Sequence, residues 1–341
     1  MPTHPLERRA GVPPEASPVE GRKDNKPVLA LTGATGFIGG AMAAHFSASG
    51  WRVRALARDT SRATHLGRQG LELVIGSLAD DGSLSTLVDG ASAVVHCAGA
   101  VRGLTDEDFH STNVEGVTRI ATAAARQTPQ PVFVSLSSLA AREPELSPYA
   151  ASKRRGEQAL ADSAGDMCWV ALRPPAVYGP GDRASLPLLQ SLMRGTMLVP
   201  GTPENRFSLL YVEDLVAAVD ACLSAGTSAA GGIFELHDGR PGGYDWHDLR
   251  DIAAHLRGKP VRMIVVPPWV LRAGAWLNKG WGRLSGETPL LTPGKVGELT
   301  HADWVCDNSA FTAVCGWAPS TAFAAGLRRT LAADDEPAKA S

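Results

Sequence analysis

The cysteines of this 341-residue sequence lack the spacing of disulfide-bonded or metal-binding proteins. The five cysteines (97, 168, 222, 306 and 315) are an odd number, and none forms a C-x-x-C pair. A disulfide framework or a structural zinc site would need such spacing, so we predict no disulfide and no metal site. Reduced cysteines are typical of the cytoplasm, and we predict a cytoplasmic location.

A large net charge is also missing. Thirty-three Lys and Arg residues face 35 Asp and Glu residues, which leaves a formal charge of −2. Proteins that bind nucleic acid through bulk electrostatics carry a clear basic excess, so we predict no nucleic-acid partner.

No uncharged run in the sequence has the character of a transmembrane helix. The longest, 27–51, contains glycines throughout and alternates small with large residues, which indicates a strand, a turn and a helix. Residues 1–26 are rich in Pro, Glu and Arg without an apolar signal segment, and they predict a disordered leader. The polar residues 333–341 predict a disordered tail.

Hydrophobic residues make up 44% of the chain, which is enough for a substantial core. From 27 to 180, short apolar runs alternate with alanine-rich segments of helical spacing, such as 40–49 and 117–127. This alternation predicts an α/β fold, a doubly wound parallel sheet of the Rossmann type. The expected strands are 28–32, 53–56, 71–75, 93–96, 132–136 and 169–172.

The alternation weakens after residue 180, where prolines and glycines become common. We predict a smaller mixed α/β lobe over 181–332 that covers the substrate, with some segments returning to the first domain. Its expected helices are 185–195, 212–225, 246–257 and 269–277, and its expected strands are 197–199, 207–210, 233–236 and 262–266.

The first expected strand leads into a glycine-rich turn of the form G-x-x-G-x-x-G. Glycines in such a turn permit a sharp bend, the approach of a pyrophosphate to backbone N–H groups, and close packing of the next helix. A dinucleotide would contact Gly33, Thr35, Gly36, Phe37, Ile38 and Gly39.

The end of the second strand sets the choice of cofactor, because an acidic residue there would hold the ribose diol of NAD. Ala57 occupies that position and Arg58 follows it, with Arg62 nearby. A guanidinium binds a 2′-phosphate well. We therefore predict NADP(H) as the preferred cofactor, with NAD(H) as the alternative, since Asp59 is adjacent.

Three polar residues follow the fifth strand with a spacing that suggests proton chemistry. Ser138 lies at the strand end, and Tyr149 and Lys153 are four residues apart at the start of an expected helix, one turn from each other. A nearby ammonium favours the phenolate and would lower the tyrosine pKa, while a serine hydroxyl can polarise a carbonyl.

Several motifs in order resemble the extended type of the short-chain dehydrogenase/reductase superfamily. This type is also described as the NAD-dependent epimerase/dehydratase family, and it includes 3β-hydroxysteroid dehydrogenases and dihydroflavonol reductases. The motifs are T-G-A-T-G-F-I-G from Thr32, H-C-A-G from His96, N-V-E-G from Asn113, S-L-S-S from Ser135, Y-A-A-S-K from Tyr149, L-R-P-P-A-V-Y-G-P-G-D from Leu172 and Y-V-E-D-L from Tyr211.

The resemblance implies a role for each matched residue. Ser138, Tyr149 and Lys153 would be catalytic, with Tyr149 as general acid/base and Lys153 also binding the nicotinamide ribose, while His96 would be structural. Further cofactor contacts would come from Ser77, Leu78, Ala98, Gly99, Asn113, Pro174 and Val177, and substrate contacts from Val101, Ser138, Tyr178 and Arg206.

Two departures bear on the cofactor and the substrate. Ser77-Leu78 replaces the Asp-Leu that contacts adenine in similar chains, so this contact would be weaker. Leu139-Ala140 replaces the Val-Tyr of many sugar epimerases, which argues against a sugar substrate. The candidates for the cations that a sugar nucleotide would need are Arg183, Arg194 and Arg206.

The expected activity is hydride transfer between a nicotinamide and a secondary alcohol or ketone. The apolar segments 263–271 and 273–277 favour a small-molecule substrate that is sterol-like or polycyclic, and they also fit core packing, a partner or peripheral membrane contact. A nucleotide-sugar epimerase or dehydratase and a non-catalytic scaffold are the alternatives. The resemblance also implies a homodimer through 105–127 and 149–163.

Overall fold

A single parallel sheet organises the first half of the chain in the computed structural model, which describes residues 26–59, 67, 70–103, 105–285 and 291–335. Its seven strands have the order β11-β6-β5-β4-β1-β2-β3, and every neighbouring pair is parallel. The strands are β1 (Val28–Thr32), β2 (Arg52–Ala57), β3 (Glu72–Ile75), β4 (Ala93–His96), β5 (Val132–Leu136), β6 (Trp169–Arg173) and β11 (Gly232–Glu235).

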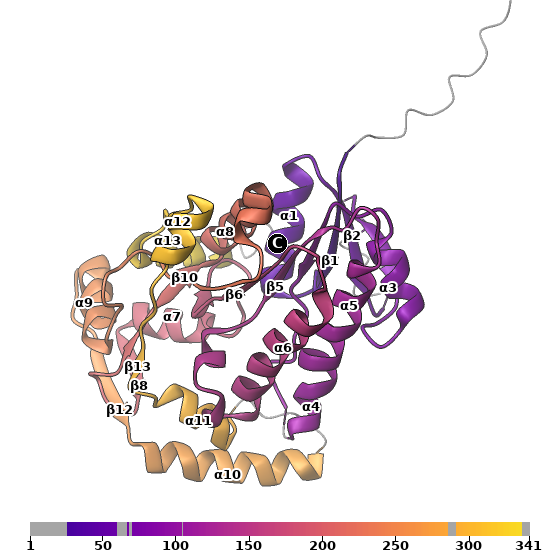
Figure 1. Cartoon of the computed structure of the whole chain (residues 1–341). Helices are drawn as coiled ribbons and strands as arrows, with labels where there is room; N and C mark the ends of the chain where they lie inside the picture. Colours follow the sequence, from indigo (N-terminus) through magenta and orange to yellow (C-terminus); the bar gives the residue numbers. More distant parts are fainter. Residues whose placement is uncertain (1–25, 60–66, 68–69, 104, 286–290, 336–341) are drawn as a thin grey trace, which may run out of the picture.

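Helices cover both faces of the sheet (Figure 1). Helices α1 (Phe37–Ala48) and α8 (Val212–Ala225) bury residues such as Met42, Phe46 and Leu215 against one face. On the other face, Leu84, Ile120 and Leu160 are buried from α3 (Asp81–Val88), α5 (Gly116–Ala125) and α6 (Pro148–Ala164). Because both faces are covered, the central strands read as continuous apolar runs, and this explains why the sequence revealed them.

The later part of the chain packs around a third apolar cluster that includes Leu192, Val199, Tyr211 and Phe323. Short parallel pairs build it: β7 (Ala176–Tyr178) with β10 (Leu209–Tyr211), β8 (Thr196–Pro200) with β12 (Arg262–Val266), and β9 (Arg206–Phe207) with β13 (Asp303–Trp304). The remaining helices of eight or more residues are α7 (Leu186–Arg194), α9 (Trp246–Arg257), α10 (Pro268–Ser285) and α13 (Phe323–Asp335); the shorter ones are α4 (Asp106–His110), α11 (Pro293–Leu299) and α12 (Ser309–Cys315), with turns of other helix types at η1 (Ser111–Glu115), η2 (Leu139–Arg142), η3 (Pro144–Leu146) and η4 (Gly226–Ala229).

The predicted fold class is confirmed, and three details add to the expected elements. Strand β11 comes from the later part and joins β6 as a seventh strand. Helix α10 continues to Ser285, eight residues beyond its expected end, and α13 continues to Asp335 into the expected tail. The rest of that tail, 336–341, and residues 1–25 of the expected leader lie outside the described residues.

Three findings concern metal ions, membrane spans and cysteine pairing in the described part of the chain. No cluster of His, Cys, Asp or Glu could hold a metal ion there. None of its helices has both the length and the apolarity to span a bilayer. The five cysteines, all of which are described, are unpaired.

A buried ion pair joins the sheet to α6. The Arg173 guanidinium on β6 donates from Nε and Nη2 to the two carboxylate oxygens of Glu157 on α6, each at 2.7 Å. The Ser137 hydroxyl at the end of β5 donates to the same carboxylate at 2.5 Å. Bidentate geometry with a further donor is the arrangement in which a buried pair fixes orientation, so α6 is locked in register against β5 and β6.

We expect Glu157→Ala to destabilise the protein by about 3–5 kcal/mol, because the buried Arg173 guanidinium loses its bidentate partner and keeps only the longer 3.8 Å contact with Glu235. Urea unfolding measures this loss. Asp162→Ala is the matched control on the same helix: its carboxylate accepts a hydrogen bond from Gln158 at the exposed surface, and we expect a change within about 0.5 kcal/mol. Equal stabilities for the two variants would contradict this account of the pair.

Candidate active site

The glycine turn between β1 and α1 is too tightly packed for side chains at two of its positions. Gly33 has φ of 76°, and a Cβ there would lie 2.7 Å from the Ala98 nitrogen in the segment after β4. A Cβ on Gly39 would lie 2.1 Å from the Gly33 carbonyl oxygen. The turn therefore brings the start of α1 against the carboxyl edge of the sheet, as the spacing of its glycines predicts.

The start of α1 is open to an anion. Gly36 is its N-cap residue, and no side chain of the described residues caps it. Thr35 and Gly36 are exposed, and the first turn contains no acidic residue. Free N–H groups and the positive end of the helix dipole suit a pyrophosphate, so this end of α1 fits a dinucleotide.

Beside the turn, polar contacts hold the segment that follows β4. The Thr32 hydroxyl accepts from the Ala98 N–H at 3.2 Å and bonds His96 Nδ1 at 2.8 Å. Asn113 exchanges hydrogen bonds with Ala100, with its Oδ1 accepting at 2.8 Å and its Nδ2 donating at 2.9 Å. Asn113 is itself buried, so it fixes the conformation of this segment and does not form part of its exposed surface. Burial lowers the pKa of His96 to about 3, in keeping with a structural, uncharged imidazole.

Ser138, Tyr149 and Lys153 converge at the carboxyl ends of β4 and β5. The Ser138 side chain hydrogen-bonds the Tyr149 hydroxyl and also accepts from the Ala140 N–H at 3.2 Å. The Lys153 ammonium donates to the Leu136 carbonyl at 2.9 Å, and a Cβ on Gly99 would lie 3.1 Å from its Nζ. The three residues therefore surround one point beside the segment that follows β4.

The pKa of Tyr149 reflects its burial. Burial raises its pKa to about 12; the bond to Ser138 lowers the value in part, and the negative charge of Glu298 raises it further. Burial lowers the pKa of Lys153 to about 8. The lowering of the Tyr149 pKa by Lys153 stays a prediction, while burial is the largest influence on this hydroxyl.

A cavity of about 450 Å³ opens in front of Tyr149. Val101, Phe109 and Pro148 give it apolar walls, and α11 closes it on the other side. Its lining is Val101, Arg102, Gly103, Phe109, Ser147, Pro148, Tyr149, Ala184, Thr292, Pro293, Gly294, Lys295 and Glu298.

Glu298 places a carboxylate in this cavity from a position 149 residues after Tyr149 in the sequence. It is 8% exposed, accepts a hydrogen bond from the Ser147 hydroxyl and pairs with Lys295 Nζ at 2.9 Å. The Ser147 hydroxyl also caps α6 by accepting from the Ala150 N–H at 3.0 Å. The sequence analysis missed Glu298, because no local pattern reveals that α11 packs on the start of α6.

Comparison with known proteins identifies the family. A profile of the NAD dependent epimerase/dehydratase family matches residues 29–236. The chain belongs to this family. It is 38% identical over 282 residues to the ceramide reductase of Caulobacter vibrioides, which covers 82% of this chain and 86% of that one.

More distant relatives agree with this assignment. The 2-alkyl-3-oxoalkanoate reductase of Stenotrophomonas maltophilia is 28% identical, over 89% of this chain and 98% of its own. The solved structure of MoeE5 in complex with UDP-glucose and NAD superposes with a TM-score of 0.70 at 20% identity, over 92% of this chain and 99% of that one. The resemblance to extended short-chain dehydrogenases/reductases is confirmed, and the chain is an NAD(P)-dependent dehydrogenase/reductase or epimerase/dehydratase.

The epimerase/dehydratase fold places most of the other predicted cofactor residues along the same edge of the sheet. Arg58 is exposed directly after β2, and Ser77 and Leu78 follow β3. Pro174 accepts a backbone bond from Leu139 at 2.9 Å. The remaining residues of this set lie in the α1 turn (Phe37 and Ile38) and in β7 (Val177).

Two of the predicted substrate residues lie elsewhere. Tyr178 is 3% exposed, with its ring packed edge-on against Tyr211 and Phe323 in the third apolar cluster. Arg206 donates to the Gly242 carbonyl at 2.7 Å, and it does not belong to the described lining of the cavity. The structure does not bring these two residues to the described lining of the cavity, whereas Val101 does line it.

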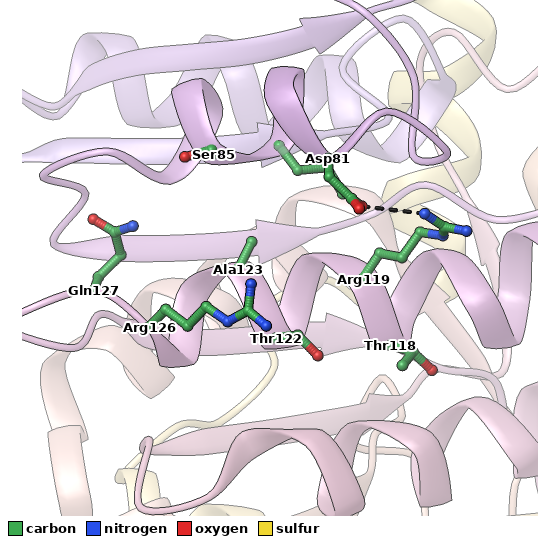
Figure 2. A pocket seen from close by; sticks show the side chains of 9 residues that line it. Asp81, Ser85, Thr118, Arg119, Thr122, Ala123, Arg126 and Gln127 are labelled. Carbon is green, nitrogen blue, oxygen red and sulfur yellow. Dashed lines mark hydrogen bonds and ion pairs between the residues drawn. The ribbon is translucent and has the colours of Figure 1, made fainter.

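A second, smaller hollow lies between α3 and α5 (Figure 2). The Arg119 guanidinium reaches Asp81 across it at 3.1 Å. None of the predicted cofactor or substrate residues belongs to its described lining, so the cavity at Tyr149 remains the candidate site in this family member.

We expect Gly39→Ala to lower the affinity for the dinucleotide at least about tenfold. The new methyl group would displace the Gly33 carbonyl and with it the phosphate-binding turn. Calorimetric titration with NADPH and NADH measures the effect. Gly40→Ala is the matched control on the next residue, where a Cβ would make an ordinary contact of 3.6 Å with Ala34. Equal affinities for the two variants would show that the turn does not hold the dinucleotide.

Proposed function

We propose that this protein is an NADP(H)-dependent reductase of a lipid ketone of the ceramide class. The observation that carries the proposal is the cavity at Tyr149, which combines apolar walls with the carboxylate of Glu298. Such a cavity suits an uncharged, amphiphilic substrate whose reacting oxygen meets Tyr149 while its hydrocarbon lies on the apolar wall.

The carboxylate of Glu298 in this cavity argues against a sugar nucleotide. A diphosphate needs fixed cations, and none of Arg183, Arg194 and Arg206 belongs to the described lining. Two other cations do belong to it: Lys295, which is paired with Glu298, and Arg102, which is exposed to solvent. An anionic substrate would also be repelled by the Glu298 carboxylate.

The relatives favour the lipid ketone for an independent reason. One relative, at 38% identity, is a ceramide reductase, and another, at 28% identity, is a 2-alkyl-3-oxoalkanoate reductase. Ceramide carries a single secondary alcohol, so the matching substrate for a reductase is the corresponding ketone. The earlier preference for a sterol-like or polycyclic substrate gives way to this class, and a homodimer remains a proposal from the family alone.

In this proposal the residues of the site have separate tasks. A bound nicotinamide supplies the hydride. Tyr149 donates its hydroxyl proton to the substrate oxygen, and its raised pKa keeps that proton in place at neutral pH. Ser138 hydrogen-bonds the same oxygen and orients the Tyr149 hydroxyl. Lys153 stabilises the tyrosinate that forms and contacts the cofactor ribose.

We expect Tyr149→Phe to lower kcat for the reduction of 3-ketoceramide about 100- to 10,000-fold, since the proton donor is lost. NADPH fluorescence follows the reaction, with a sterol ketone and UDP-glucose as competing substrates. Tyr178→Phe is the matched control: it removes a buried hydroxyl that has no hydrogen-bond partner among the described residues, and its activity should be unchanged.

Two outcomes would contradict the proposal. An epimerase returns its hydride in every cycle, so conversion of UDP-glucose without net NADPH consumption would establish the sugar alternative. A Tyr149→Phe variant that keeps full biological activity would favour the non-catalytic scaffold.

We also propose that Arg58 selects NADP(H). Removing its guanidinium should weaken NADPH binding about 10- to 100-fold and leave NADH binding unchanged, because only the 2′-phosphate needs the charge. Dissociation constants for both cofactors test this. Arg52→Ala, an exposed arginine of the same strand region whose ion pair is with Glu72, is the control. A wild-type protein that binds NADH more tightly than NADPH would refute the preference.

A further inference from the structure

Helix α10 presents an apolar face to solvent at the edge of the molecule. Trp269, Trp276 and Leu277 are 71%, 64% and 76% exposed, and Val270 and Ala273 are exposed between them. Their spacing of one, four, seven and eight residues places them on one side of the helix. Ala275, on the opposite side, is fully buried. Figure 1 shows α10 lying lengthwise along the lower edge of the molecule.

The strand pair that leads into α10 continues this apolar character. Leu198 of β8 and Ile264 of β12 are paired in register and are 51% and 39% exposed. Val265, next along β12, is 45% exposed on the other face of this strand pair, where its register partner Val199 is buried. Large apolar side chains that gather on one part of a surface indicate an interaction site rather than chance exposure.

The charges of this part of the chain have one sign. Residues 258–286 contain five basic residues, Lys259, Arg262, Arg272, Lys279 and Arg283, and no acidic residue. This contrasts with a whole chain in which acidic residues slightly outnumber basic ones. Lys259, Arg262 and Arg272 are exposed.

We propose that α10 is a membrane-docking helix, which lies in the headgroup region of a bilayer containing anionic phospholipid. Tryptophan and leucine on one face, with basic residues and no acidic ones, form the composition that binds at such an interface. The basic residues complement the negative surface of the bilayer. A protein partner or a second copy of this chain would not require charges of a single sign.

Docking through α10 would also serve the cavity. Helix α10 contacts α11, and α11 contributes Lys295 and Glu298 to the lining in front of Tyr149. A lipid substrate would thus be presented next to the wall of the site instead of crossing water. This consequence rests on the proposed function, whereas the docking itself does not.

Flotation of the full chain with vesicles tests the docking, without cofactor or substrate. We expect binding to phosphatidylcholine vesicles that contain phosphatidylglycerol, weakened by high salt because the attraction is partly electrostatic. The W269S/L277S variant should bind at least about tenfold more weakly, since two exposed apolar side chains are lost. R272E should bind these vesicles about fivefold or more weakly but should bind pure phosphatidylcholine as the wild type does.

Val314→Ser is the matched control, because Val314 is an exposed apolar residue on α12, 37% accessible and away from α10; it should bind as the wild type. Absence of vesicle binding by the wild type, or equal binding by W269S/L277S, overturns the proposal. Sedimentation of the same variants identifies the alternative occupant: a dimer that W269S/L277S converts to a monomer, without vesicle binding, would assign the face to a second copy. Reductase assays with a short, water-soluble ketone report the proposed function separately.

Discussion

The arrangement of the candidate site depends on the buried contact between Glu157 and Arg173. Tyr149, Lys153 and Glu157 lie on successive turns of α6, so the position of one fixes the others. Glu157 is held by β6 through Arg173 and by the end of β5 through Ser137. Ser138 follows Ser137 directly, two residues beyond the end of β5. A single carboxylate therefore sets the distance between the serine on the sheet and the tyrosine on the helix.

Around this contact, different described residues form different parts of the candidate site. The turn before α1 is open to an anion, and the segment after β4 is held in place by Thr32 and Asn113. Ser138, Tyr149 and Lys153, which converge at the carboxyl ends of β4 and β5, lie between this segment and the cavity. The order of the strands explains the arrangement, because β1 and β4 are neighbours at the point where the sheet reverses its winding.

Much of this could be predicted from the sequence, for local reasons. The glycine turn, the strands of the sheet and the four-residue spacing of Tyr149 and Lys153 are patterns within short segments, and the structure contains them. The position of Glu298 could not be predicted, because it depends on α11 packing against a helix that begins about 150 residues earlier. The same is true of the Tyr149 pKa, which follows from burial and from that distant carboxylate.

The misplaced residues have the same explanation. Tyr178 belongs to a motif that ends at the edge of the sheet, but its ring turns into the apolar cluster because Gly326 of α13 leaves room for it. Arg206 is expected at the site from the sequence, but its guanidinium donates to the backbone carbonyl of Gly242 in its own lobe. Motifs locate a segment near the site, while the direction of each side chain depends on packing that the motif does not encode.

Ser147 has a consequence that extends beyond the start of its helix. Its hydroxyl caps the first turn of α6 and also donates a hydrogen bond to the Glu298 carboxylate on α11. This hydrogen bond links the start of α6, which forms one wall of the cavity, to the Glu298 carboxylate that enters it from α11. A displacement of α11 would change the width of the cavity and would also change the distance between the Glu298 carboxylate and Tyr149. Because that carboxylate raises the Tyr149 pKa, the binding of a large substrate and the transfer of the tyrosine proton would be coupled.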